Sequence, residues 1–162
     1  MSPQAKTATV MTGFDRRTLE HVARTTLAAV ISLALARLLR LPESFWAPVT
    51  AVVVMQSTLG ASWAASVQRF VGTVIGAAAG AIAATYFRGN ALAFGIGILL
   101  LGLFCAALRL DRAAYRFAGI TLAIIMLVAS AAPPWRLATH RFIEVTLGIL
   151  VGLGIMAVWP ER

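Results

Sequence analysis

Six apolar segments, separated only by short polar turns, follow one another along the chain and restrict what it can fold into. A bilayer core of about 30 Å needs roughly 20 mostly apolar residues per helix. The spans expected on this basis cover residues 22–41, 45–59, 66–87, 91–108, 114–132 and 139–159. The composition agrees, because 60% of the 162 residues are hydrophobic and only 12% are charged. We predict an all-α polytopic integral membrane protein with six transmembrane helices.

The second segment is the least regular of the six. No charged residue occurs between Ser44 and Gln68, but Pro48 lies near the start of the segment and a polar run beginning at Gln56 ends it. We predict a short helix with two possible explanations. It is broken, as in transporters that expose backbone to a substrate, or its polar end lies in the headgroup region.

The charges predict how the chain is inserted. Residues 1–21 form a short cytoplasmic tail in this interpretation, followed by a membrane domain of residues 22–162. Nine lysines and arginines then fall on the cytoplasmic side and five on the other, which predicts that both termini are cytoplasmic. Arg16 and Arg17 also permit a twin-arginine export signal, which we disfavour because the following apolar stretch runs directly into Arg37.

One pattern occurs twice in the chain. Arg69 and Arg141, 72 residues apart, are each followed by a phenylalanine and an apolar run, and other arginines and aromatic residues keep the same spacing. This shift relates residues 17–90 to residues 89–162, which is three spans to three spans. Because three is odd, the second half would be inserted upside down. We therefore predict a 3+3 inverted repeat, as in many transporters.

Glycines follow both arginines at a four-residue spacing. Glycine lets helix backbones approach closely in a membrane, so we predict a helix-packing role for Gly72, Gly76, Gly80, Gly148 and Gly152. At the 72-residue shift, the place of Gly72 is taken by Glu144. This difference directs attention to the sixth span.

Glu144 is the only acidic residue within a predicted span. His140 and Arg141 lie on the same side of the expected helix, four and three residues earlier. A carboxylate beside an arginine and a histidine can exchange protons as a bound anion comes and goes, which fits a substrate or proton pathway. The alternative is an interfacial ion pair between Arg141 and Glu144 that fixes the helix end.

Three further residues are candidates for the same pathway. Arg69 and Arg24 could attract a carboxylate, since guanidinium groups bind carboxylates through two hydrogen bonds. Alternatively, both side chains extend to lipid phosphates. Gln56 could donate hydrogen bonds beside a broken second helix, or simply be an interfacial polar residue.

Several functions are disfavoured. The basic residues that give a net charge of +8 are dispersed between apolar runs, so they form no continuous surface for nucleic acid. Cys105 has no second cysteine in the sequence, and no metal-ligand cluster, nucleophile and base pair, or phosphate-binding loop is evident. We therefore expect no enzymatic activity, no metal and no cofactor.

The run from Phe45 to Ser62 and the run from Gln68 to Gly76 resemble the fusaric acid resistance protein family. The likeness rests on Trp-x-Pro-x-Thr at Trp46 and on Arg-Phe-x-Gly-Thr-x-x-Gly at Arg69, and extends over nearly all the chain from about His21. This family resembles part of the aromatic acid exporter group, and the membrane region of plant aluminium-activated malate transporters is similar.

The resemblance implies export of small organic or aromatic carboxylic acids across the bacterial inner membrane, driven by protons. Many members of the family carry a cytoplasmic domain or a second membrane block, so this chain looks like a minimal unit embedded in the lipid bilayer. Such a unit has little interior of its own, and we expect a homodimer or higher oligomer, with a periplasmic adaptor protein as a possible partner. A passive organic-anion channel and a non-transporting scaffold stay open as alternatives.

Overall fold

The computed structural model describes residues 16–128 and 132–159, and every regular element in this part of the chain is an α-helix. The helices are α1 (Arg16–Leu38), α2 (Trp46–Val54), α3 (Leu59–Phe87), α4 (Ala91–Ala107), α5 (Arg112–Leu127) and α6 (Pro134–Val158). The prediction of an all-α fold is confirmed.

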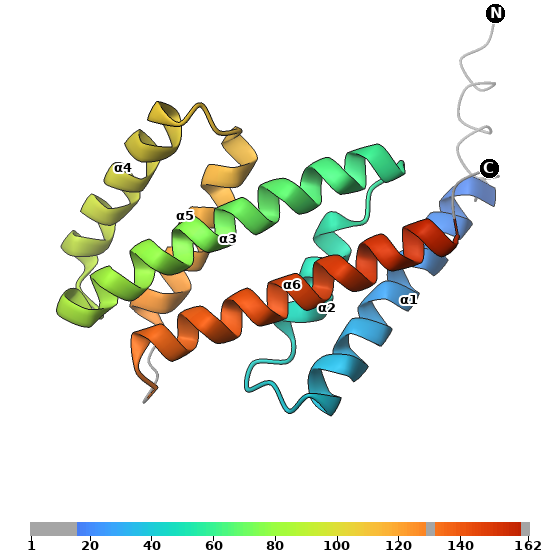
Figure 1. Ribbon diagram of the computed structural model, residues 1–162, viewed down its shortest axis with the longest axis horizontal. Helices are drawn as coiled ribbons and strands as arrows, with labels where there is room; N and C mark the ends of the chain where they lie inside the picture. The colour runs from blue at the N-terminus through green and yellow to red at the C-terminus, as the bar shows by residue number, and fades with distance from the viewer. Residues whose placement is uncertain (1–15, 129–131, 160–162) are drawn as a thin grey trace, which may run out of the picture.

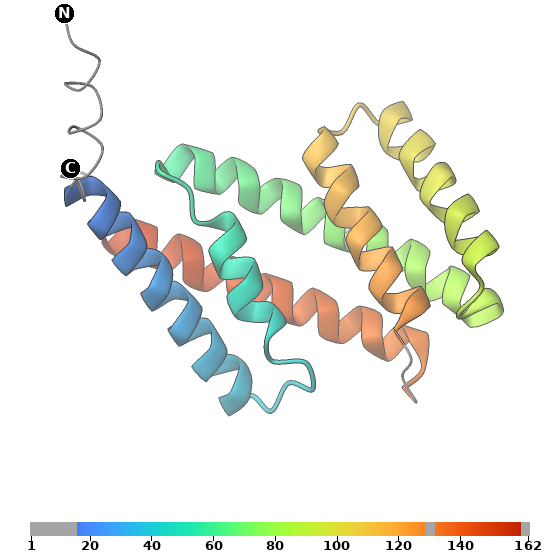
Figure 2. The ribbon, with the colours of Figure 1, turned by 180° about the vertical axis from the view of Figure 1, so that it is seen from behind.

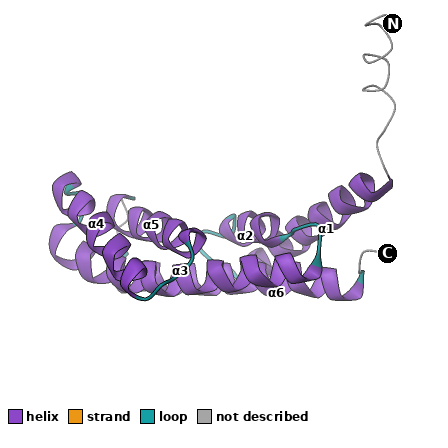
Figure 3. Cartoon of the chain, turned by 90° about the horizontal axis from the view of Figure 1, so that it is seen from above, coloured by secondary structure: helices purple, strands orange, loops and turns teal. Residues whose placement is uncertain are grey.

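The two longest helices, α3 and α6, lie side by side and run in opposite directions (Figure 1). The other four cross one face of this pair in the order α1, α2, α5 and α4 (Figure 2). Seen from above, the helices form two layers (Figure 3). Side chains that point from α3 and α6 toward the second layer therefore meet α2 and α5.

Glycines set the distance between the layers. Gly72 and Gly76 bring α3 so close to α5 that a Cβ at Gly76 would collide with the backbone of Ala118. Gly148 and Gly152 likewise bring α6 close to α2, where a Cβ at Gly148 would collide with the backbone of Ala47. Close backbone approach of this kind is the usual use of glycine between membrane helices.

These contacts correct the 72-residue alignment. Gly72 faces α5 as Gly148 faces α2, with a Cβ 2.8 Å from Phe117 Cβ in one case and 2.7 Å from Thr50 Cβ in the other. By packing, Gly72 is the counterpart of Gly148, so Glu144 does not take its place. A constant shift fails because the turns and helices of the two halves differ in length.

The helix boundaries were predicted unevenly. α4 matches to within one residue, but α3 begins seven residues before the expected Ser66, and α6 begins five before Thr139. Thr58 accepts a hydrogen bond from the Ala61 N–H at 3.2 Å and caps α3. Pro134 occupies the first turn of α6, where its missing N–H costs nothing. Both helices therefore extend beyond their most apolar stretches.

Two other elements differ from the expected bounds. α1 begins at Arg16, so the first helix extends into residues 16–21 of the predicted tail. α2 ends at Val54 because Met55 is extended, and the polar residues that follow make the turn into α3. The Ser62 hydroxyl holds this turn by accepting a hydrogen bond from the Gln56 backbone N–H at 2.9 Å. The second apolar segment is thus a short helix followed by a turn.

Length and surface agree with a membrane protein. Among the described helices, α1, α3 and α6 are long and apolar enough to cross a membrane, and α4 is a shorter apolar helix. The nine residues of α2 extend about 14 Å at 1.5 Å per residue, less than the bilayer core. Large apolar side chains such as Leu38, Ile82 and Leu92 are exposed, as lipid contact requires. Six complete spans therefore stay a prediction.

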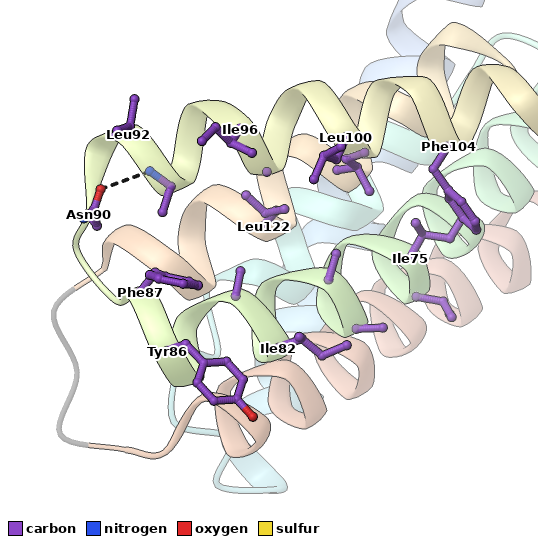
Figure 4. A pocket seen from close by; sticks show the side chains of 17 residues that line it. Ile75, Ile82, Tyr86, Phe87, Asn90, Leu92, Ile96, Leu100, Phe104 and Leu122 are labelled. Carbon is purple, nitrogen blue, oxygen red and sulfur yellow. Dashed lines mark hydrogen bonds between the residues drawn. The ribbon is translucent and has the colours of Figure 1, made fainter.

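The two ends of the molecule are packed differently. α1 contacts both α2 and α6, whereas α4 contacts mainly α5 and leaves a groove of about 890 Å³ against α3 (Figure 4). Asn90 lies at one end of this groove and caps α4 by accepting a hydrogen bond from the Ala93 N–H at 3.0 Å. The rest of the lining is almost wholly apolar and includes Ile82, Tyr86, Leu92, Ile96, Leu100 and Phe104.

Candidate functional site

Two arginines are buried where α3 and α6 cross. Arg69 is 5% exposed and Arg141 is 3% exposed. The residues that follow them, Phe70 and Phe142, place their rings 5.4 Å apart and mark the crossing. Because α3 and α6 begin earlier than predicted, both arginines lie inside their helices rather than in the first turn, and both side chains are buried within the protein.

Arg141 is held by the start of α2 and the turn before it. Its guanidinium carbon lies 3.6 Å from the centroid of the Trp46 ring, a close cation–π contact. Its Nη2 is 3.5 Å from Glu43 Oε2, and the Trp46 indole N–H donates a hydrogen bond to that same oxygen at 3.1 Å. Arg141, Trp46 and Glu43 therefore form one connected group.

Glu144 is linked to this group by a hydrogen bond from the backbone N–H of Glu43. Its side chain is completely buried, and Oε1 accepts a hydrogen bond from the Glu43 N–H at 3.2 Å. Oε2 has no hydrogen-bond partner. The interpretation of Arg141 and Glu144 as a direct ion pair is wrong in detail, because Arg141 reaches Glu43 instead and Glu144 receives the backbone of the α1–α2 turn.

Arg69 has a different environment. Its Nη2 donates to Thr50 Oγ1 at 3.5 Å, and its guanidinium carbon lies 4.7 Å from the centroid of the Phe117 ring. Its Nε has no hydrogen-bond partner. Within residues 16–128 and 132–159, no carboxylate comes within ion-pair distance of Arg69.

Arg69, Arg141 and Glu144, with the side chains that contact them, form one buried cluster. The other predicted residues make no hydrogen bond or ion pair to this cluster in the described structure. Arg24 is buried and donates to the Trp159 carbonyl at 3.2 Å, so it binds the C-terminal end of α6. Gln56 is exposed in the α2–α3 turn, and its amide donates to the Val53 carbonyl at 3.0 Å. His140 is half-buried on α6, and no polar contact joins it to Glu144 in the described structure.

Sequence reasoning missed four members of the cluster, Glu43, Trp46, Thr50 and Phe117. Trp46 and Thr50 were in view as the ends of the Trp-x-Pro-x-Thr element, and Arg69 begins the second element. The structure thus brings the two motifs together. Glu43 also carried a signal, since it is the only acidic residue between Glu20 and Asp111.

The cluster can bind an anion and hold a proton. A guanidinium lying flat on an aromatic ring keeps its N–H edge free for a carboxylate, and the free oxygen of Glu144 can take a proton in a site from which water is excluded. Among the described residues, no group of three histidines, cysteines or acids is close enough to hold a metal ion.

A model of the family described as fusaric acid resistance protein-like matches residues 25–155. The proteins named uncharacterised transporter YdhK, from Escherichia coli K12 and Salmonella typhimurium, are 32% identical over 150 residues, which covers 87% of this chain and 22% of theirs. The inner membrane protein YeeA of Escherichia coli K12 is 32% identical over 153 residues, 88% of this chain and 41% of YeeA.

The chain therefore spans about a fifth of the length of YdhK and two-fifths of that of YeeA. No solved structure matches. The resemblance to plant malate transporters stays a prediction.

Proposed function

The chain belongs to the fusaric acid resistance protein-like family, and from this premise we propose that it forms a membrane unit for proton-coupled export of small organic or aromatic carboxylic acids. The names of its relatives support the class, because YdhK is named a transporter and YeeA an inner membrane protein. On this proposal the chain lies in the bacterial inner membrane.

The observation that carries the proposal is the buried cluster of Arg141, Glu43 and Glu144. A charge at the centre of a membrane helix costs about 2.5 to 3.5 kcal/mol, so such groups usually serve a function. Here Arg141 and Glu144 lie inside α6, and both are almost completely buried. A purely structural helix of this length needs neither residue.

In the proposed cycle, a substrate carboxylate displaces Glu43 from Arg141. The two groups are chemically alike, and the Glu43 side chain is 32% exposed, so it can leave toward water. The Trp46 ring then offers a flat apolar surface beside the bound carboxylate. For export driven by an inward proton gradient, Glu144 gives up its proton when the substrate carboxylate binds and takes up a proton again when the substrate has left and Glu43 has returned to Arg141.

We also propose that the two halves form a 3+3 inverted repeat. Two observations support it: α5 packs on α3 as α2 packs on α6, and the pairs Gly72 with Gly76 and Gly148 with Gly152 serve the two contacts alike. α3 and α6 are antiparallel (Figure 1), as an inverted pair requires. The equivalent residues follow the packing rather than a constant shift of 72.

Flux through liposomes tests the function. Purified protein is assayed for benzoate movement with and without a pH gradient, as wild type, as Glu144→Gln and as the control Glu20→Gln, whose carboxylate lies in an exposed pair on α1. We expect gradient-driven flux in the wild type and the control and its loss in Glu144→Gln. Flux that does not depend on the pH gradient would indicate a passive channel. The absence of flux in every sample would indicate a scaffold.

The quaternary structure is part of the same proposal. We propose a homodimer or higher oligomer with both termini cytoplasmic, which works with a periplasmic adaptor protein. Light scattering of the protein in mild detergent measures the mass of the assembly. A strictly monomeric protein would contradict the proposed oligomer without affecting the flux assay.

A further inference from the structure

Arg69 is a buried cation with no counter-charge within ion-pair distance among residues 16–128 and 132–159. A charged group removed from water is normally paired, because isolated burial is costly. Arg141 has a counter-charge in Glu43 at 3.5 Å, although its Nε and Nη2 make no hydrogen bond to the described residues. Arg69 has only the Thr50 hydroxyl at 3.5 Å and the face of Phe117, and neither carries a charge.

A second unpaired group lies on the same face of α3. Ser66 precedes Arg69 by three residues, one helical turn, and is 3% exposed. In the part of the chain that the structure describes, neither Ser66 Oγ nor Arg69 Nε has a hydrogen-bond partner, although both are closed off from the surface. Buried donors without acceptors are rare in folded proteins and call for an explanation.

We propose that a small monovalent inorganic anion such as chloride binds at Arg69, with Ser66 and Thr50 as its hydroxyl ligands. The anion supplies the missing negative charge and accepts the unused Nε–H and O–H donors. The anion binds at Arg69, whereas the organic acid is proposed to bind at Arg141. Because Ser66 and Arg69 are enclosed, the ligand is small and largely stripped of water, which excludes benzoate-sized anions.

Thermal unfolding in nanodiscs tests the site without any measurement of transport. The full-length protein is unfolded in sodium chloride, sodium gluconate or sodium benzoate at equal ionic strength, and tryptophan fluorescence gives Tm. We expect chloride at 100-fold above its Kd to raise Tm by about 5 to 10 °C relative to gluconate. Any increase in Tm with benzoate should persist in Arg69→Met, because benzoate is too large for the enclosed site at Arg69.

Three variants assign the effect. Arg141→Met, the matched loss of the other buried arginine, should keep the chloride response, and Arg69→Met should lose it. Ser66→Ala should need about tenfold more chloride for the same increase, as for one lost hydrogen bond to an ion. An unchanged chloride response in Arg69→Met, or none in the wild type, would overturn the proposal.

If Arg69→Met does not fold, Ser66→Ala and bromide decide. Anomalous scattering from crystals grown in bromide should place the ion beside Arg69, and its absence there would equally reject the site. Since none of these measurements requires flux, failure of the proposed export function leaves their outcome readable.

Discussion

Arg69 and Arg141 occupy the same crossing of α3 and α6, and each is covered by an aromatic ring, yet only Arg141 has an acidic partner. Glu43 pairs with Arg141 at 3.5 Å, whereas Arg69 meets a hydroxyl at that distance. The two arginines therefore share an aromatic cover and differ in whether an acidic side chain lies within ion-pair distance. Contact between the helices explains why both arginines are buried. The acidic partner, which only Arg141 has among the described residues, is the feature that bears on function.

The largest effects should come from the packing that the halves share. A Cβ at Gly76 would collide with the backbone of Ala118, whereas at Gly152 the nearest atom would be the Val54 Cγ2 methyl group at 2.8 Å and the nearest backbone atom would lie 3.7 Å away. We expect Gly76→Ala to cost about 3 kcal/mol and Gly152→Ala about 1 kcal/mol. Unfolding of each variant in nanodiscs gives both values.

Gly154→Ala is the matched control on α6, since nothing lies within 4 Å of a Cβ there. Alanine is the better helix former, so this variant should be stabilised by about 0.5 to 1 kcal/mol. Equal losses at Gly76 and Gly152 would show that the two contacts do not differ as the structure describes.

The charge difference between the halves predicts opposite responses to the same substitution. Arg141→Met leaves Glu43 without its cation, which costs 3 to 5 kcal/mol for a fully buried pair. Glu43 is about one-third exposed, so we expect a loss of about 2 kcal/mol. Arg69→Met strands no acid, and in gluconate it should be neutral or stabilising by up to about 1 kcal/mol. Chemical denaturation of both variants makes the comparison.

A double variant checks the cause of the first effect. In Arg141→Met/Glu43→Gln the Glu43 carboxylate that paired with Arg141 is removed as well, so about half of the lost stability should return. The comparison of the two arginines fails if Arg69→Met and Arg141→Met lose the same amount in gluconate, or if the double variant regains nothing.

The sequence was a good guide to the helices and a poorer guide to their ends. Apolar run length located all six helices, because such runs have few other ways to satisfy their backbone in a membrane. It missed the first turns of α3 and α6, where Thr58 and Pro134 extend the helices beyond the apolar runs. That error placed both buried arginines near a helix end.

Apart from Arg69, the members of the site that the sequence predicted lie close together in the chain. Arg141 and Glu144 share one helix face, so their spacing revealed them. Glu43 is bound to Glu144 across 101 residues of chain, and no local pattern reports such a contact. Gln56 illustrates the opposite error, because its polarity in an apolar region suggested a ligand, and its amide binds the end of its own helix.

A smaller effect on stability should distinguish the two aromatic rings that cover the arginines, Trp46 at Arg141 and Phe117 at Arg69. Trp46→Phe keeps a ring over Arg141 but removes the hydrogen bond to Glu43, at a cost of about 1 kcal/mol. Phe117→Leu removes only a cation–π contact and some packing, also about 1 kcal/mol. The distinction appears in a Glu43→Ala background, where the Trp46→Phe loss should vanish and the Phe117→Leu loss should persist.

The smallest predicted effect concerns a feature that the two halves have in common. α1 and α4 end alike, with Arg40 and Arg109 at φ 52° and 54°, a left-handed conformation that favours glycine. In each case the next residue closes the helix end, by the Leu41 N–H to Ala36 and the Leu110 N–H to Cys105, both at 3.0 Å. Arg40→Gly and Arg109→Gly should each stabilise the protein by about 0.5 to 1 kcal/mol, as measured by Tm. Arg37→Gly, inside the last turn of α1, is the control and should cost about 1 kcal/mol. A gain at only one of the two helix ends would mean that the halves differ even where their backbones agree.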